Sequence, residues 1–307
     1  MRKLIGMLFA ATLLFACNAQ AQVAVPKLAP LAPQINSNEF APRAFFVTLN
    51  PAAMQWGTPS RLGGGTFKGE IKNISPGTIQ TTFFDGNYGG LRLVGENVSF
   101  AAQTISLKVD PPTIQERKSQ AAAIAFQIGQ EWAFGLSGTS AERTLPALTL
   151  ESDTVDLGLS WRVNESFFMG LSLGRQTRTN PGAGSSSRGV AKAGIAYRDG
   201  GDVQWHFEVF GIFRDEVSVT APGPFVPGVQ TTGLTAEINI LGFLISLTGL
   251  STSIDPNNEI SSLIMDVGIA PNGGLAVLYH RETQSTKVGV GLEFETTTNA
   301  VSLAWLF

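Results

Sequence analysis

The sequence predicts an all-β protein: a transmembrane antiparallel β-barrel of about 14 strands, with 12 as the alternative, preceded by an N-terminal plug or hatch segment. Three observations support this fold class. Apolar residues alternate along many segments, both ends carry features of exported membrane proteins, and charged residues make up only 15% of the chain. Soluble domains usually contain about 25% charged residues, so this composition suits an apolar environment.

The C-terminal segment predicts a lipid-facing last strand. Alternation places four apolar side chains on one face, namely Val301, Leu303, Trp305 and the terminal Phe307. This pattern resembles the C-terminal assembly signal of bacterial outer-membrane barrels. The resemblance implies a location in the bacterial cell outer membrane, with outer-membrane lipid, periplasmic chaperones and the barrel-assembly machinery as partners.

The N-terminus predicts a cleaved signal peptide over residues 1–21. Arg2 and Lys3 precede an uncharged apolar run from Leu4 to Ala16, and a small-residue cleavage site ends at Ala21. Cys17, the only cysteine, leaves with this peptide, although its context also resembles a lipoprotein signal, so lipidation stays open. Without the peptide, 19 of the 21 basic residues remain against 24 acidic ones, a balance that argues against a nucleic-acid partner.

Period-two alternation predicts the strands of residues 57–307. Apolar residues alternate with small or polar ones over 155–163, 167–174, 203–209 and 288–295. A charged group facing lipid at mid-membrane costs about 2–4 kcal/mol, so charges within these strands are expected to point into the barrel. The residues concerned are Asp156, Arg162, Glu208 and Glu293. A soluble β-sandwich also alternates, and it remains the rival architecture.

Counting connections backwards from Phe307 assigns each to one end of the barrel, because both termini are expected in the periplasm. The expected outer connections are 297–299, 271–274, 220–228, 180–187, 145–150 and 109–118. The expected periplasmic connections are 283–285, 255–258, 199–202, 164–165 and 129–131. This alternation requires 229–254 to be one long or kinked strand, and three strands in 60–107 complete an even number.

Residues 22–56 form the only long stretch without strand alternation, which predicts a plug inside the barrel, with a periplasmic tail as the alternative. Asn50-Pro51-Ala52, before the glycine-rich first strand, resembles a motif of the long-chain fatty-acid and aromatic-hydrocarbon transporter family, the FadL type. Asn38-Glu39-Phe40 resembles that family's N-terminal motif. The resemblance implies an N-terminal hatch, passive uptake of hydrophobic compounds and a side exit at a bent strand. Phe45 and Phe46 would give the plug an apolar surface.

Apolar residues of inward parity are candidate ligand contacts. These are Phe168, Phe210, Ile212, Leu278 and Phe243. Phe225 and Val226, set between prolines in a predicted outer loop, could capture hydrophobic molecules or belong to an ordinary rigid loop. The resulting hypothesis is an outer-membrane channel for fatty acids or aromatic hydrocarbons. A nonspecific or structural barrel is the alternative, and packing against the plug would explain the inward apolar residues equally well.

A barrel hydrolase is the less favoured class, and no enzyme activity is expected. The chain has two histidines, and neither is accompanied by a neighbouring serine motif. His206 shares its face with Glu208 and could pair with it, whereas His280 lies in Tyr279-His280-Arg281 and is expected to be solvated near a strand end. No ligand spacing for a metal is present, so neither a metal nor another cofactor is expected.

Overall fold

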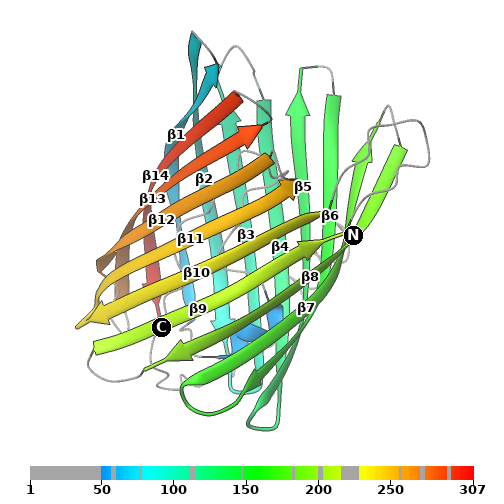
Figure 1. Ribbon diagram of the computed structural model, residues 1–307. Helices are drawn as coiled ribbons and strands as arrows, with labels where there is room; N and C mark the ends of the chain where they lie inside the picture. Colours follow the sequence, from blue (N-terminus) through cyan, green and yellow to red (C-terminus); the bar gives the residue numbers. More distant parts are fainter. Residues whose placement is uncertain are drawn as a thin grey trace.

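The chain folds into a closed antiparallel barrel (Figure 1). The computed structural model describes residues 50–56, 60–75, 78–110, 115–146, 148–181, 184–199, 203–215, 228–255, 258–269, 274–288 and 292–307. The predicted signal peptide and residues 22–49 lie outside the described residues. Within the described ranges, a short 3₁₀ helix, η2 (Pro51–Gln55), precedes fourteen strands. The strands are β1 (Arg61–Ser75), β2 (Thr78–Val94), β3 (Val98–Val109), β4 (Gln115–Ile128), β5 (Trp132–Leu145), β6 (Leu148–Arg162), β7 (Phe167–Asn180), β8 (Gly184–Arg198), β9 (Val203–Arg214), β10 (Val229–Ile240), β11 (Phe243–Asp255), β12 (Asn258–Ile269), β13 (Gly274–Val288) and β14 (Leu292–Leu306).

Every strand pairs with its sequence neighbour, and β1 pairs with β14 to close the barrel. The predicted fold class and strand number are confirmed. Closure pairs each strand on both sides through the body of the barrel, which is the condition for a sheet to cross a lipid bilayer. Only distal hairpin tips, such as the start of β2, extend beyond the neighbouring strand.

The barrel is apolar on its outer surface. Along β7, Leu171 and Leu173 are exposed, whereas Ser172 between them is 1% exposed. The same alternation of exposed apolar and covered small or polar side chains recurs around the barrel. A soluble sandwich would bury the apolar face, so the outer surface is built to meet lipid.

Aromatic side chains concentrate at one end of this outer surface. Trp132 stacks on Trp161 with ring centroids 5.4 Å apart, and Phe167 meets Tyr197 edge-on at 5.2 Å. These residues flank the connections at 129–131 and 163–166, at the end where β14 finishes. We call this the proximal end and the opposite one the distal end. Aromatic rings of this kind favour the membrane–water interface.

The predicted single strand over 229–254 is wrong, because β10 and β11 are separate strands joined at Leu241 and Gly242. Both residues have positive φ, 52° and 89°, and the Asn239 side chain accepts a hydrogen bond from the Gly242 amide at 2.9 Å. Positive φ at both central positions is the backbone of a tight hairpin turn. Leucine rarely adopts this conformation, so Leu241 is not a turn signal in the sequence.

The predicted turns at 283–285 and 297–299 are also wrong, since they lie inside β13 and β14. The threonine and serine residues there are strand residues, not turn residues. One strand too many in 274–307 and one too few in 229–255 offset each other, so the total was correct. The connections near 255–258 and 271–274 accordingly lie at the ends opposite to those expected.

The prediction that Glu293 points into the barrel is wrong. Asp156 and Glu208 lie on the inner face, but Glu293 shares its parity with the exposed Leu303 and faces outward. It lies near the distal end of β14 and accepts a hydrogen bond from Ser285 Oγ at 2.7 Å. The prediction treated 288–295 as one continuous strand. In the structure β13 ends at Val288 and β14 begins at Leu292, so the inward and outward positions of β14 cannot be counted on from β13.

Candidate functional site

Residues Asn50–Trp56, which we call the NPA segment, lie against the inner face of the wall formed by β3–β7 (Figure 1). The local sequence dictates the fold of this segment. The Asn50 side chain accepts a hydrogen bond from the Ala52 amide at 3.0 Å, and Pro51 occupies the first position of η2. Asparagine before a helix and proline at its start are both favourable, because they satisfy or remove unpaired N–H groups.

Three inward glycines on neighbouring strands make room for the start of the NPA segment. A Cβ added to Gly158 on β6 would lie 2.1 Å from Asn50 Oδ1, and one on Gly170 of β7 would lie 2.6 Å from Asn50 Nδ2. A Cβ on Gly135 of β5 would lie 2.4 Å from the Ala52 nitrogen. Asn50 Nδ2 also donates to the Leu159 carbonyl oxygen at 2.9 Å. The three strands therefore form a seat for the start of the NPA segment, and side chains at the three glycine positions would fill it.

Polar side chains fix the other end of the NPA segment. Gln55 donates to the Ala125 carbonyl at 3.2 Å and accepts from Ser99 Oγ at 2.8 Å. Trp56 Nε1 donates to Ser160 Oγ at 3.0 Å. These bonds reach β3, β4 and β6. Because they are buried, each is shielded from competing water, so the bonds position the segment firmly.

An ion pair lies one inward position further from the proximal end than this seat. Lys192 Nζ on β8 is 2.7 Å from Asp156 Oδ2 on β6. The pair spans β7 at Gly174, where a Cβ would lie 2.1 Å from Asp156 Oδ1. Both charged groups are largely buried, and glycine on the intervening strand lets them meet.

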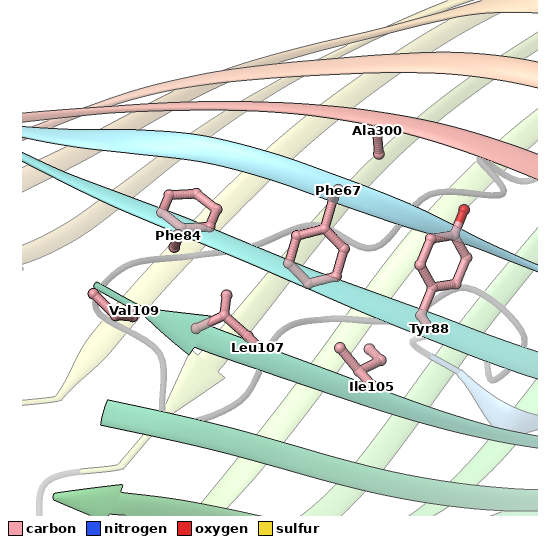
Figure 2. Packing of buried hydrophobic residues seen from close by; sticks show 7 residues of the cluster. All are labelled: Phe67, Phe84, Tyr88, Ile105, Leu107, Val109 and Ala300. Carbon is pink, nitrogen blue, oxygen red and sulfur yellow. The ribbon is translucent and has the colours of Figure 1, made fainter. Parts of the chain in front are cut away.

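The distal half of the inner wall carries an apolar cluster (Figure 2). We call it the inner apolar cluster; its members are Phe67, Phe84, Tyr88, Ile105, Leu107, Val109 and Ala300. The aromatic rings lie over glycines of adjacent strands, so that a Cβ on Gly86 would touch the Phe67 ring and one on Gly69 the Phe84 ring. Sequence reasoning missed this cluster. The sequence feature that could have revealed the cluster is the occurrence of glycine-rich and aromatic segments together in 63–90.

The inner face of β10–β14 is mostly polar, apart from a buried apolar cluster near its proximal end that consists of Leu244, Ala276, Leu278, Ala304 and Leu306. Threonine hydroxyls pair across β10 and β11, with Thr231–Thr252 and Thr235–Thr248 both at 2.9 Å. Tyr88 hydrogen-bonds Ser302 where this polar wall meets the inner apolar cluster. The interior of the barrel thus presents an apolar and a polar side next to each other.

His280 belongs to the polar wall, and the expected solvated position is wrong. It lies in the middle of β13, is 0% exposed, and its Nδ1 is 2.7 Å from Asp266 Oδ1. The neighbouring Tyr279 and Arg281 face outward, so alternation buries the residue between them. The other histidine, His206, has its Nε2 3.5 Å from Glu208 Oε2 on the same face.

The structure places the predicted ligand residues in different surroundings. Phe168 packs on Trp56 with ring centroids 6.3 Å apart, the Phe210 ring lies over Gly233, and Ile212 and Leu278 are buried. Phe243 is wrong as an inward residue, because it is 48% exposed on the outer surface beside the turn that splits β10 from β11. The remaining predicted residues lie outside the described residues, namely Phe225, Val226, Asn38, Glu39, Phe40, Phe45 and Phe46.

Of the predicted plug residues, Asn50, Pro51 and Ala52 lie inside the barrel. The predicted assembly residues Val301, Leu303, Trp305 and Phe307 all face outward and are exposed. No group of His, Cys, Asp and Glu in the described ranges could hold a metal ion. In the same ranges no helix is both long and apolar enough to cross a membrane.

The fold and interior define a class: a membrane-type β-barrel whose lumen holds part of its own N-terminal segment. Solved structures resemble this fold. The monoaromatic hydrocarbon channel CymD matches at 13% identity and TM-score 0.59, covering 84% of this chain and 91% of its own. The Pseudomonas putida toluene transporter TodX matches at 9% identity and TM-score 0.58, covering 85% and 93%.

A Pseudomonas aeruginosa FadL homologue matches at 10% identity and TM-score 0.54, covering 84% and 93% of the two chains. No protein-family model and no curated protein matches the sequence. The expected resemblance to the FadL-type family is therefore confirmed at the level of the fold.

Proposed function

We propose that this protein is an outer-membrane channel for the passive uptake of small hydrophobic molecules, in which the NPA segment narrows the proximal, periplasmic side. The inner apolar cluster is the observation that carries the proposal. A water-filled pore has a polar interior. Here Phe67, Phe84 and Ile105 pack into a buried apolar cluster on the inner side of β1–β3.

The seated NPA segment supports the same function. A barrel of this size leaves an interior wide enough for water, so a selective channel must fill part of it. Asn50 and Gln55 anchor the segment by side-chain bonds to strands rather than by a backbone ladder. Such an anchor can be released without breaking the barrel. The solved structures of similar fold are described as hydrocarbon channels and a toluene transporter, which agrees with an apolar cargo.

The test uses the purified full chain in lipid vesicles. Toluene uptake and the swelling of vesicles in small sugars are measured side by side, with empty vesicles as the control. The proposal predicts accelerated toluene uptake with little sugar entry. Free passage of sugars, unchanged when residues 22–49 are removed, would instead establish the nonspecific pore.

A further inference from the structure

Arginines gather on the inner wall at one level of the strands β4–β9. Arg117 pairs with Leu107 of the inner apolar cluster and with Arg143, and directly paired residues share a face of the sheet. Arg178 pairs with the buried Ser152 in the same way. We call these inward residues the arginine belt; its members are Arg117, Arg143, Arg178, Arg188 and Arg214.

The last two members also face the lumen, at the same level as the others. Arg188 Nε donates to Gln176 Oε1 on β7 at 2.7 Å, and Arg214 pairs with the buried Val190. Each member of the arginine belt lies ten or eleven residues from the proximal end of its strand. That length of tilted strand rises by roughly 25–30 Å, about the height of the apolar outer band of such barrels. The arginine belt therefore lies at the distal opening of the barrel.

Acidic residues at this level point the other way. Glu116 and Glu142 each directly precede a member of the arginine belt, so alternation turns them to the outer face. There Glu116 pairs with Lys118 at 3.1 Å, on side chains that are 36% and 57% exposed. The two strands β4 and β5 thus sort their charges, with acids outside and arginines inside.

Inward acids do not offset the charge of the arginine belt. On the described inner face of β4–β9 the acids are Asp156 and Glu208, and both lie closer to the proximal end. Asp156 is already paired with Lys192 at 2.7 Å. Like charges that face each other directly destabilise a sheet, so the pairing of Arg117 with Arg143 has a cost. A positive patch kept at such a cost around an opening is suited to attracting anions.

We propose that the arginine belt is an anion-binding site at the distal opening, and that the cargo it admits is a small organic anion, an apolar body with one carboxylate or sulfonate group. This inference rests on the proposed uptake function and narrows its substrate class. Guanidinium groups bind such anions through paired N–H donors. Arg143 and Arg178 are only half-buried, so water and dissolved anions reach them. Because charge acts over several ångströms, the arginine belt concentrates anions without a closely fitting pocket.

The test compares two aromatic ions of opposite fixed charge, p-toluenesulfonate and benzyltrimethylammonium. Neither ion loses its charge near neutral pH, so neither crosses bare lipid readily. Entry of each is measured at about 10 mM salt into neutral phospholipid vesicles that carry the purified full chain, where screening is weak. Empty vesicles are the control, and toluene uptake is followed in parallel. A one-signed field raises entry rates about tenfold or more, so the sulfonate should enter about ten times faster than the ammonium ion.

Removing part of the arginine belt should lower this preference. Electrostatic energy is proportional to charge, so the double variant Arg143→Gln, Arg178→Gln should reduce a preference of about tenfold to about fourfold. The matched control is Lys108→Gln with Lys118→Gln, which removes two charges from exposed residues at the same level of the outer face. It should leave the preference unchanged. Heat-modifiable migration on gels checks that every variant is a folded barrel.

Salt supplies an independent readout. The Debye length falls from about 30 Å at 0.01 M to about 3 Å at 1 M, so about 1 M salt should abolish the preference and leave toluene uptake unchanged. A preference that persists in high salt would come from the shape of the lumen, and the arginine belt would be refuted as its cause.

The remaining outcomes separate the two proposals. If toluene enters but the sulfonate enters no faster than the ammonium ion, the anion site is refuted and the uptake function stands. If the lysine variant lowers the preference as much as the arginine variant, the overall charge of the chain is the cause and the anion site is again refuted. If the sulfonate is preferred but toluene uptake equals that of empty vesicles, the uptake of uncharged hydrophobic molecules fails while the anion site stands.

Discussion

At the scale of single residues, glycines shape the interior of this barrel. Gly135, Gly158 and Gly170 lie on the inner face of three successive strands, and each would collide with the NPA segment if it carried a side chain. Asn50 fits against them and bonds the Leu159 carbonyl. The seat exists because these three positions have no side chain, so adding a side chain at any of them should disrupt it.

Gly158→Ala should loosen the NPA segment. The added methyl group lies 2.1 Å from Asn50 Oδ1, and such overpacking costs about 1–3 kcal/mol. We expect faster entry of small sugars into vesicles, with the barrel still folded. Gly138→Ala is the matched control, because nothing lies within 4 Å of its added Cβ. Sugar entry equal in the two variants would show that the seat does not hold the segment.

The Asp156–Lys192 pair makes a second prediction at this scale. Removing one partner of a buried pair leaves an uncompensated charge and typically costs about 3–5 kcal/mol, whereas removing both costs much less. The pair retains some exposure, so the lower end of that range applies. Urea unfolding in vesicles should show Lys192→Met to be less stable than the double variant with Asp156→Asn. Equal losses in the two variants would mean that the charges act independently.

At the scale of the element, the hairpin between β10 and β11 shows how one backbone turn decides topology. Leu241 adopts φ 52° and is 90% exposed, so its side chain contributes little packing within the protein. For most residues a left-handed backbone is strained, and asparagine or glycine tolerates it best. The turn forms because the strands on both sides pair along their full length.

Leu241→Asn should stabilise the barrel by roughly 0.5–1 kcal/mol, since Asn-Gly is the preferred sequence of this turn type. Gly242→Ala should destabilise it, because φ is 89° there. Unfolding midpoints in urea test both changes. A loss of stability in Leu241→Asn would show that Leu241 contributes through the membrane surface rather than through the turn.

The elements were predictable from the sequence wherever alternation and turn chemistry agreed. Residues 115–215 show both, and the number and order of their strands are confirmed, although β4, β6 and β8 begin a few residues earlier than expected. Where a turn lacked glycine, asparagine or proline at its first position, as at Leu241, the strand break was missed. The NPA segment was identified by its motif. The inner apolar cluster was not, because aromatic and glycine residues gather there through pairing between strands, which a single strand's pattern does not display.

At the scale of the whole molecule, the aromatic belt and the chain end lie together at the proximal end. Trp132, Trp161 and Phe167 flank short connections there, and Phe307 donates its amide to the Ser60 carbonyl at the same end. Short turns and both chain ends are expected on the periplasmic side. This arrangement predicts that the proximal end faces the periplasm.

Cysteine labelling on intact cells tests the orientation. Cys17, the single cysteine, lies in the predicted signal peptide, so introduced cysteines give a clean signal. Asp110→Cys at the distal end should react with a membrane-impermeant maleimide, and Glu131→Cys at the proximal end should react only after lysis. The reverse labelling pattern would show that the distal end, and not the proximal end, faces the periplasm.

The central claim is that the NPA segment lies in the lumen and controls passage through it. Ala52 and Ala133 are both 0% exposed and pack in one cluster with Trp56, so cysteines at both positions are the pair to be joined by a disulfide. The decisive measurement is toluene uptake by vesicles carrying this double variant, before and after reduction. We predict slow uptake while the bond holds the segment in place, and recovery once it is reduced. A disulfide that forms without slowing uptake would contradict the claim.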